Sequence, residues 1–565
     1  MINFNNISLL HYVMLMLFVL ITCASSSSSS AEPIHASLYY NKVSGTYTVK
    51  TGVYDTNAIA YAKFTPSYED IGWDYLTLSS YIGNDHTKYS DVQKAYAMGY
   101  LEGYITSHRI YTFYSNVKAY RYRDHGGEMP ESTRKFLIDN NNFLKQQINL
   151  YKDSDPFWEH ISYITYQFQG IVDGYNANTF QLNRKISYLE FHAINCFGDI
   201  TELAHYDKAY RPNFKNMTSK QAATWFDDHN HCSALIKTAP DFSDIFFAHN
   251  TWLSYNHMHR IFKEYRFATK KATEKARTMV FSSYPGVISS PDDFYITDQD
   301  LFIAETTHSI WDETLYEDMT SETVLTWLRA LVSMKLSSNG DEFVKYFTKY
   351  NSGTYNNQFQ ILDMKLVDLD NKTIHDKALM ILEQIPGHFQ YEYKTNILKR
   401  GYWASYNTPS FELMQEIGGV NQYLIDNPDL IPKFDYERSS RAQIFRRDQH
   451  KVSSIEDMKF IMTYNNFKND PLSYGDASCT IAGRRDLLDE PLCSGMIDAK
   501  ISSVKETKGI KQKKINIISG PTNTQQYAFN WKNTTCDVGH VEFTHNGQPD
   551  EWNFPWVVYT TELFE

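Results

Sequence analysis

Cysteine 232 has neighbours typical of a nucleophile. It follows the polar run DHNH at 228–231, opens an alternating, strand-like run and precedes His249 by 17 positions. If the His231–Cys232 peptide bond is broken, the free α-amine of Cys232 lies beside its own thiol. Such an amine titrates near pH ~7.7–8.0 and a thiol near ~8.5, so the neutral amine can accept the thiol proton. The same thiol can attack the preceding carbonyl, move the acyl group from nitrogen to sulfur and let water complete the cut.

The local sequence leaves a structural interpretation of Cys232 open. A lone cysteine in a secreted chain is usually half of a disulfide, and a buried strand cysteine is also common. Six cysteines are present, and Cys23 lies in a segment predicted to be removed. Five remain, and an odd number leaves at least one free thiol. We expect a local disulfide between Cys479 and Cys493 and interpret Cys232 as the unpaired cysteine.

The first residues predict a processing signal. The apolar run LLHYVMLMLFVLI at 9–21 is followed by small residues and six serines. This run is too short to span a bilayer, and small residues follow it as at a signal-peptidase site. We therefore predict a signal peptide over 1–24, with a retained anchor as the alternative because no Lys or Arg precedes the run. No other stretch is long and apolar enough to span a bilayer, so no permanent membrane span is expected.

The composition is typical of a globular chain and predicts a core rich in aromatic side chains. Of 565 residues, 42% are apolar, 21% are charged and 15% are aromatic. The net charge is −12 and no basic tract stands out, which argues against binding nucleic acid. Glycosylation sequons begin at three asparagines and predict exposed backbone there: Asn216, Asn371 and Asn533.

Hydrophobic periodicity predicts an α+β domain with helices packed on antiparallel sheets. The helices are expected at 87–113 and at 132 to about 170, and the strands at 36–53, 232–238, 244–251, 293–296, 301–306 and 357–367. Met258, Ile261, Phe262 and Tyr265 recur at spacings of three and four, which predicts one more helix. Residues 206–231 are polar and contain Pro212, which predicts an exposed loop that can be cut.

Several motifs together resemble the phospholipase B-like family of secreted and lysosomal proteins. HCSALIK at 231–237 is followed by AHNTW at 248–252. The further matches are YPG at 284–286, SS at 289–290, DDFY at 292–295, ETT at 305–307, NSGTYNNQ at 351–358, GYWASYN at 401–407, RAQIFRRDQ at 441–449, NDPLS at 469–473 and GQPD at 547–550. The resemblance covers the chain from about residue 40 to its end. One departure is Phe359, where the family usually carries Trp.

This resemblance implies an N-terminal nucleophile hydrolase with a four-layer αββα sandwich. The precursor would cut itself at His231–Cys232 into two fragments, 25–231 and 232–565, that stay associated as one unit. The family name implies removal of fatty acyl chains from glycerophospholipids, in the lysosome or outside the cell. Cys232 would form the thioester.

Other residues are weaker candidates for the site. His249 and Trp252 lie on the strand predicted to return beside Cys232, and could respectively orient the nucleophile and wall the pocket. Asn356 or Asn357 could donate an amide N–H to the oxyanion of a tetrahedral intermediate. Each has a structural alternative: a hydrogen-bonded histidine, a core ring and turn residues. Two further candidates are Thr306, at a strand end, and Arg447, which could hold an anionic group or form a surface ion pair.

Absent motifs narrow the chemistry. The sequence contains no HExxH zinc motif, no GxSxG nucleophile elbow, no P-loop and no GxGxxG fingerprint. We therefore expect no metal and no cofactor, and the usual serine lipase mechanism is disfavoured. An amidase acting on peptides or N-acyl amides is the enzymatic alternative, because N-terminal nucleophile hydrolases usually cleave amides. A processed lipid-binding protein with little catalysis is the second alternative.

Overall fold

The computed structural model describes residues 32–85, 87–122, 126–179, 183–229, 232–271, 273–308, 310–534 and 544–564. The predicted signal peptide and His231 lie outside these residues. Residues 33–565 form one contact unit. Among the described residues, no helix is long and apolar enough to cross a membrane.

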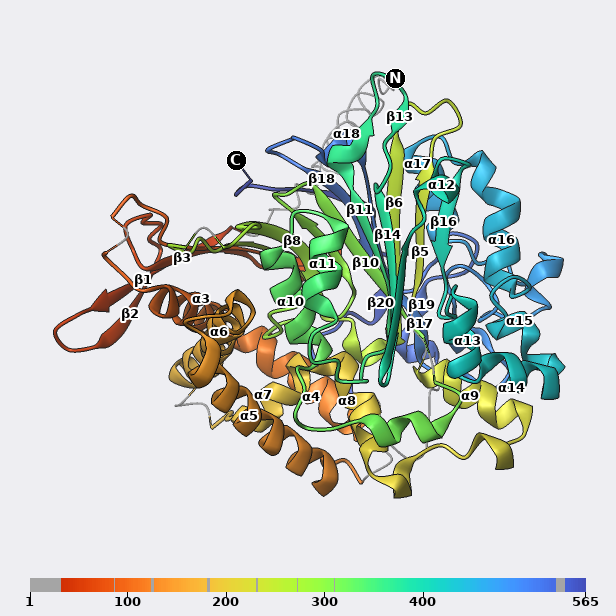
Figure 1. Cartoon of the computed structure of the whole chain (residues 1–565), viewed down its shortest axis with the longest axis horizontal. Coiled ribbons are helices and arrows are strands. Elements are labelled where there is room, and N and C mark those ends of the chain that lie inside the picture. The colour runs from red at the N-terminus through yellow and green to blue at the C-terminus, as the bar shows by residue number, and fades with distance from the viewer. Residues whose placement is uncertain are drawn as a thin grey trace, which may run out of the picture. The chain divides into compact units, whose positions relative to one another are not determined.

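Two β-sheets form the centre of this unit (Figure 1). The long sheet has the order β15-β14-β11-β10-β9-β8-β7-β4-β3-β1-β2. Its strands are β1 (Ile34–Asn41), β2 (Thr46–Thr51), β3 (Ala60–Thr65), β4 (Asp74–Ser80), β7 (Ile261–Arg266), β8 (Thr278–Ser283), β9 (Phe294–Thr297), β10 (Leu301–Thr307), β11 (Asn357–Asp363), β14 (Leu379–Ile385) and β15 (His388–Tyr393). Neighbouring strands are antiparallel except β4 and β7, which are parallel.

The short sheet has the order β16-β5-β6-β17-β18-β21. Its strands are β5 (Ser233–Thr238), β6 (Ile245–Ser254), β16 (Tyr402–Ser405), β17 (Ser494–Ser503), β18 (Lys514–Ser519) and β21 (Val557–Thr560). This sheet packs face to face on the long one. The ring of Phe247 stacks on that of Phe302 with centroids 4.2 Å apart, and Trp403 Nε1 donates to Gln358 Oε1 over 3.0 Å.

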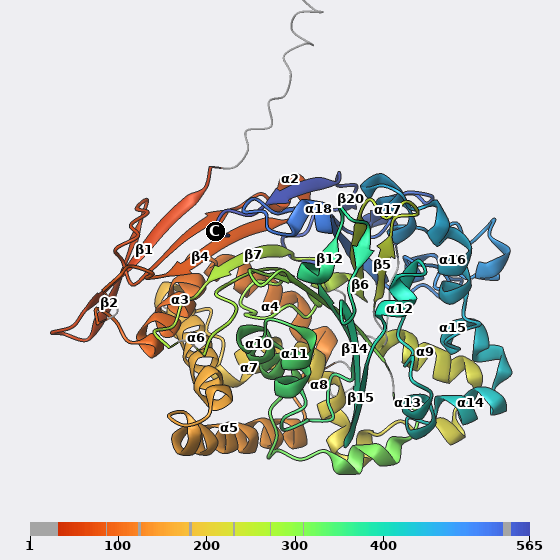
Figure 2. The same ribbon diagram turned by 45° about the horizontal axis from the view of Figure 1, so that its top comes forward.

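Helices cover the outer faces of both sheets (Figure 2). The long sheet carries α3 (Asp91–Ile105), α6 (Pro156–Thr179), α10 (Thr326–Leu336) and α11 (Gly340–Phe347). The short sheet carries α16 (Ser440–Asp448) and α17 (Ile455–Met462), whose Ile444 and Met458 pack in one core cluster with Leu235. This arrangement buries the apolar faces of both sheets on each side.

Helices α3 and α6 cross at very close range because glycines line the crossing. A Cβ added at Gly99 would lie 1.8 Å from the Gln167 carbonyl oxygen, and one at Gly174 would lie 2.0 Å from the Tyr100 carbonyl oxygen. Real Cβ atoms never approach backbone so closely, so no larger residue fits at either position.

The predicted helical regions are present, but each contains two helices. The region 87–113 corresponds to α3 and α4 (Ser107–Arg121), and the region 132–170 corresponds to α5 (Glu131–Tyr151) and α6.

The predicted α+β class is confirmed, and most predicted strands are present. The helix predicted from Met258 to Tyr265 is wrong, since Ile261–Arg266 is strand β7. This strand pairs with β4 on one side and β8 on the other, and it is buried on both faces. Ile261, Phe262 and Tyr265 are therefore all buried, and together with Met258 their spacing mimics a helix. Lys263 is neutralised by a buried ion pair with Glu102 at 2.6 Å.

The segment predicted as a polar loop is largely folded. Residues 219–229 form helix α9 (Ser219–His229), and short 3₁₀ turns precede it. Phe226 of this helix packs against Trp311 and Phe434. A single aromatic face is enough to dock an otherwise polar helix, which is why composition alone suggested a loop.

Candidate active site

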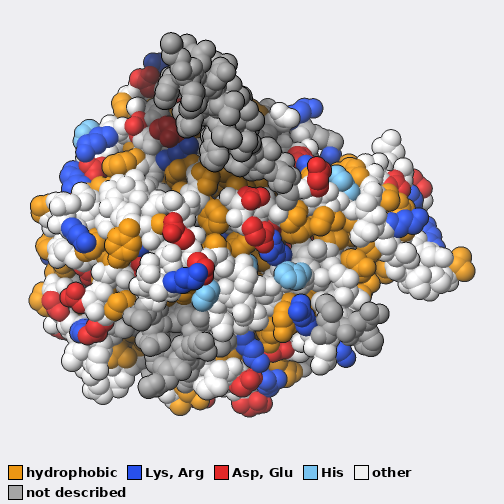
Figure 3. Space-filling view, turned by 180° about the vertical axis from the view of Figure 1, so that it is seen from behind, with side chains coloured by type: hydrophobic (Ala, Val, Ile, Leu, Met, Phe, Trp, Pro, Cys, Tyr) orange, Lys and Arg blue, Asp and Glu red, His pale blue; other side chains and the backbone are white. Residues whose placement is uncertain are grey.

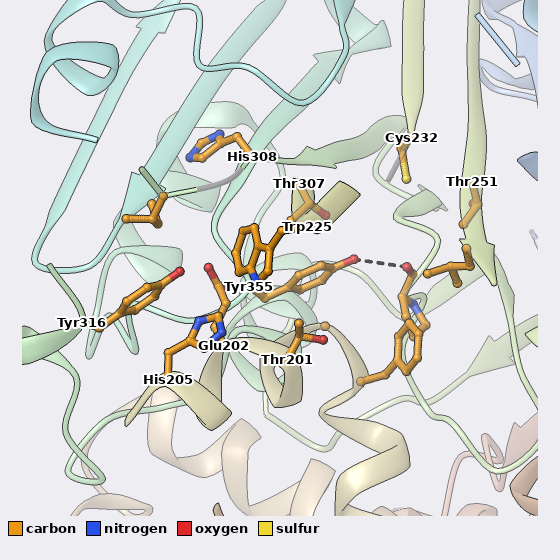
Figure 4. Close-up of a pocket in the computed structure, with 15 residues that line it drawn as sticks. Thr201, Glu202, His205, Trp225, Cys232, Thr251, Thr307, His308, Tyr316 and Tyr355 are labelled. Atoms are coloured by element: carbon orange, nitrogen blue, oxygen red, sulfur yellow. Dashed lines mark hydrogen bonds between the residues drawn. The ribbon is translucent and has the colours of Figure 1, made fainter. Parts of the chain in front are cut away.

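Cys232 lies immediately before β5 and lines a pocket of about 640 Å³ between the two sheets and helix α8 (Phe197–Leu203) (Figure 4). The residue is 3% exposed. The walls come from distant parts of the chain: Phe197, Gly198, Thr201, Glu202, His205, Trp225, Thr251, Leu253, Pro291, Thr307, His308, Ile310, Tyr316 and Tyr355. We refer to it as the Cys232 pocket.

The backbone of Cys232 is strained about its N–Cα bond, and its carbonyl oxygen is held by a hydrogen bond. Its φ is +126°, a region that residues with a Cβ rarely adopt. Its carbonyl oxygen accepts a hydrogen bond from Arg441 Nη1 at 2.7 Å, and the same nitrogen donates to Asn407 Oδ1 at 2.8 Å. The next amide, of Ser233, donates to Asn250 Oδ1 at 2.9 Å. The strain is therefore concentrated next to the His231–Cys232 bond.

Carboxyl groups with raised pKa values surround the thiol. Burial raises the pKa of Cys232 well above its usual value, and the nearby Glu305 raises it further, whereas the main-chain N–H of Trp252 opposes this rise. Burial raises the pKa of Asp293 to about 7, and burial together with Asp293 raises the pKa of Glu305 well above normal. The Tyr355 hydroxyl donates to Asp293 and, at 3.1 Å, to the Pro291 carbonyl oxygen. In the intact chain near neutral pH, the thiol and Glu305 favour their neutral forms, whereas Asp293 is close to half-ionised.

His249 lies close to the Cys232 pocket but is not one of its walls. It is fully buried on β6, on the strand face that carries Thr251 two residues later. No side chain among the described residues forms a hydrogen bond with its ring nitrogens, but the ring interacts with the Glu305 main chain. Burial and the positive charge of Lys500 hold its pKa well below the usual value, so the ring is neutral.

Trp252 points to the opposite face of β6. Its ring packs with Ala482 and Met496 rather than lining the Cys232 pocket, and its Nε1 donates to Asn250 Oδ1 at 3.0 Å. The guanidinium of Arg441 lies 4.8 Å above the ring centroid. Trp252 therefore supports the arginine that holds the Cys232 carbonyl, instead of walling the pocket.

The two asparagines differ in what they contact. Asn356 Nδ2 donates to Glu202 Oε1 at 2.7 Å and to the Gly353 carbonyl oxygen at 3.1 Å. The side-chain amide of Asn357 is fully buried and has no hydrogen-bond partner among the described residues. Asn357 lies opposite Thr307 in the strand register, and Thr307 lines the pocket. Only Asn357 keeps its amide N–H available for a ligand.

Two further candidates do not line the pocket. Thr306 Oγ1 lies 2.5 Å from Ser405 Oγ and joins the two sheets, whereas its neighbour Thr307 lines the pocket. Arg447 forms ion pairs with Asp470 at 2.8 Å and with Asp448 at 2.6 Å, and its side chain is 39% exposed. Arg447 is therefore engaged by two carboxylates, and that of Asp470 is buried.

Sequence reasoning overlooked the ionisable residues around Cys232. Asp293, Glu305 and Arg441 occur in motifs that carry the family resemblance, but none of them was assigned a role. Glu202 was also missed; burial raises its pKa to about 8, although Asn356 donates to it. A usable signal was Glu305, an acidic residue inside the apolar strand run LFIAETT.

The predicted modification sites have mixed outcomes. Asn216, Asn371 and Asn533 are exposed, as glycan acceptors must be, and their glycosylation stays a prediction. Cys479 and Cys493 are both buried; Cys493 is disulfide-bonded, but the described residues do not show the predicted pairing of Cys493 with Cys479. No group of three or more His, Cys, Asp or Glu residues suited to a metal ion was found among the described residues.

Known proteins resemble this chain over nearly its full length. The model of the family described as Phospholipase B matches residues 60–559. Phospholipase B-like protein B of Dictyostelium discoideum is 35% identical over 524 residues, covering 91% of this chain and 87% of that protein. Phospholipase B-like 1 of Bos taurus is 33% identical over 551 residues, covering 96% of each chain. Phospholipase-B 81 of Drysdalia coronoides is 32% identical over 538 residues, covering 94% and 93%.

Proposed function

The chain belongs to the phospholipase B family, and from this we propose that it is a hydrolase that removes fatty acyl chains from glycerophospholipids through a thioester on Cys232. The observation that carries the proposal is the placement of this thiol in a buried pocket, on a residue whose own φ is +126°. Strain next to a peptide bond favours its cleavage, because the products release that strain.

Self-cleavage would create the nucleophile. Cys232 Sγ attacks the carbonyl carbon of His231, the C–N bond breaks, and the acyl group moves to sulfur. Water then hydrolyses the thioester, which leaves a carboxylate on His231 and a free α-amine on Cys232. Arg441 would hold the Cys232 carbonyl during both steps. The new amine would lie beside Glu305 and Asp293, whose carboxyl groups can supply a countercharge.

Deacylation would follow the same chemistry. The neutral α-amine accepts the thiol proton, and the thiolate attacks the ester carbonyl of the lipid. The Asn357 amide is the proposed oxyanion donor, because its N–H has no other described partner. The alcohol leaves with the proton from the amine, and water then releases the fatty acid and restores the thiol. Neutral His249 has no proton-transfer role in this scheme.

Strand pairing supports the association of the two fragments after the cut. β1 to β4 belong to the proposed fragment 25–231, and β7 belongs to 232–565. β4 and β7 pair in parallel inside the long sheet, from Asp74 opposite Ile261 to Ser79 opposite Arg266. The order of layers, helices, long sheet, short sheet and helices, also supports the four-layer αββα sandwich of N-terminal nucleophile hydrolases. Lysosomal or extracellular location is part of the same proposal.

Substrate assays test the proposal directly. Purified wild-type protein is expected to release fatty acid from phosphatidylcholine, and Cys232→Ala is expected to stay uncut and release none. At the mean residue mass of the 65.8 kDa chain, the wild-type fragments are about 24 and about 39 kDa before glycans. Cleavage of N-acyl amides without phospholipid hydrolysis would establish the amidase alternative. Lipid binding without either activity would establish the binding alternative.

A further inference from the structure

A second, larger cavity adjoins the Cys232 pocket and has about 1920 Å³ of space. The two share five wall residues, which are Phe197, Thr201, His205, Trp225 and Leu253. The remaining walls come mainly from the end of α4, the start of α5 and the segment 200–224. Because Arg121 at the end of α4 lines it, we refer to it as the Arg121 cavity.

The charge of these walls differs from that of the whole chain. The chain has 66 acidic against 54 basic residues, and both kinds are interspersed over the surface that Figure 3 shows. The described walls of the Arg121 cavity contain Arg121 and Arg211 and no Asp or Glu; His257 also lines it but is neutral, because burial lowers its pKa to about 3. A concave surface with cationic groups and no carboxylate concentrates anions.

Arg121 itself has no ionic partner among the described residues. Its guanidinium has a hydrogen bond with the Tyr122 side chain and lies 5.1 Å from the centroid of the Phe197 ring, whereas its Nε and Nη2 are buried without partners among the described residues. The ionisable groups closest to it, Tyr122 and Cys196, are neutral because burial raises their pKa values. Burying an arginine without a carboxylate is costly, so its retention points to a ligand that supplies the charge.

Two hydroxyl groups belong to the same wall. Thr133 Oγ1 is buried without a hydrogen-bond partner among the described residues, and the buried Tyr122 hydroxyl lies against the Arg121 guanidinium. Both are neutral donors, and both line the Arg121 cavity. By contrast, Arg211 donates to the His205 carbonyl oxygen at 2.9 Å and lies 3.5 Å from Glu317. The free donors therefore group around Arg121 rather than around the second arginine.

We infer that the Arg121 cavity binds the phosphate group of the substrate, with the Arg121 guanidinium and the hydroxyls of Tyr122 and Thr133 as donors. A guanidinium matches the oxygens of a phosphate in a bidentate manner. The adjoining Cys232 pocket then receives the ester to be cleaved. The identity of the ligand as a phospholipid rests on the proposed function. Anion binding at the site, however, can be measured without any hydrolysis.

Binding of sn-glycerol 3-phosphate, measured by titration calorimetry with glycerol and inorganic phosphate as comparisons, tests the site. Wild-type protein is expected to bind glycerol 3-phosphate more tightly than inorganic phosphate and to show no binding of glycerol. Arg121→Gln should weaken the first Kd by about 10- to 100-fold, and Arg121→Lys by less. Arg134→Gln is the matched control, since Arg134 lies beside Thr133 but is 44% exposed and paired with Glu131. Absence of binding by wild-type protein would overturn the inference, whether or not the protein hydrolyses lipids.

Hydrolysis distinguishes recognition from a structural role. In the same detergent micelles, Arg121→Gln should lower kcat/KM for dioleoylphosphatidylcholine by a similar factor and leave that for 1-oleoylglycerol unchanged. An equal loss on both substrates, or no loss on either, would contradict phosphate recognition. If the wild-type protein hydrolyses neither substrate but binds glycerol 3-phosphate through Arg121, the proposed function fails and the anion site stands.

Discussion

The Cys232 pocket and the Arg121 cavity share part of a wall but differ in charge. Carboxyl groups with raised pKa values surround the thiol in the first, whereas the second combines arginine with no described carboxylate. One region is suited to moving protons, and the other to holding an anion. This difference implies that catalysis and phosphate recognition depend on separate residues. A substitution can therefore remove one function and leave the other intact.

The largest expected effect is a loss of catalysis that leaves anion binding unchanged. Cys232→Ala should abolish both self-cleavage and lipid hydrolysis, a loss of about 10⁴-fold or more, because no other described group can take the role of the thiol. The variant should still bind glycerol 3-phosphate, since the Arg121 cavity is formed by the intact chain. Calorimetry on the purified variant checks this, and loss of binding would show that the regions are not independent.

Removal of the proposed oxyanion donor should have the next largest effect. Asn357→Ala is expected to lower kcat by about 10²-fold on phospholipid and on neutral ester alike, because the donor acts on the acyl carbonyl. Its affinity for glycerol 3-phosphate should not change. Asn356→Ala is the matched control, since its amide is engaged by Glu202. A larger loss from Asn356→Ala than from Asn357→Ala would assign the roles the other way.

Glu202 allows a stability test of the electrostatics of the Cys232 pocket. Its pKa is about 8 in the folded protein against 4.5 for an ordinary glutamate, so ionisation of the unfolded chain costs stability as pH rises from about 4.5 to 8. Glu202→Gln removes this loss. The free energy of unfolding of Glu202→Gln minus that of wild type should therefore increase by roughly 2–4 kcal/mol between pH 4.5 and pH 8. Denaturant melts at both pH values measure the change, with the exposed Glu412→Gln as control. A constant difference across this range would contradict a raised pKa.

The smallest effect is expected outside both regions. Arg447→Ala should lower stability by about 1–2 kcal/mol, because it removes the cation from the buried Asp470 carboxylate, which keeps hydrogen bonds from the Tyr464 hydroxyl and the Leu472 amide. Hydrolysis and glycerol 3-phosphate binding should stay at wild-type levels. A tenfold loss in either assay would restore the role in anion binding considered from the sequence.

The sequence predicted the fold class and the central residue of the site, but only part of its surroundings. Strands such as β5 and β10 have flanking turns and β-branched or aromatic residues, so local patterns were sufficient. Strand β7 was misread because burial on both faces removes the alternation that marks a strand. The direction of Trp252 also depends on strand alternation relative to Cys232, which the motif alone does not reveal.

The residues that sequence reasoning missed come together only in the folded chain. Glu202 lies on α8, Arg121 on α4 and Arg441 on α16, and no sequence spacing relates them to Cys232. The raised pKa of Glu202 results from burial, and the hydrogen bond from Arg441 to the Cys232 carbonyl oxygen joins two distant segments. The two asparagines show the same limit, because only the contact with Glu202 distinguishes Asn356 from Asn357.

The central claim is that cleavage before residue 232 creates the nucleophile. N-terminal sequencing of the mature, purified protein tests it most directly. The account predicts two N-termini in equal amounts, one of them beginning Cys232-Ser233-Ala234, and a single uncut chain in Cys232→Ala. A fully active protein with no N-terminus at Cys232 would contradict the account.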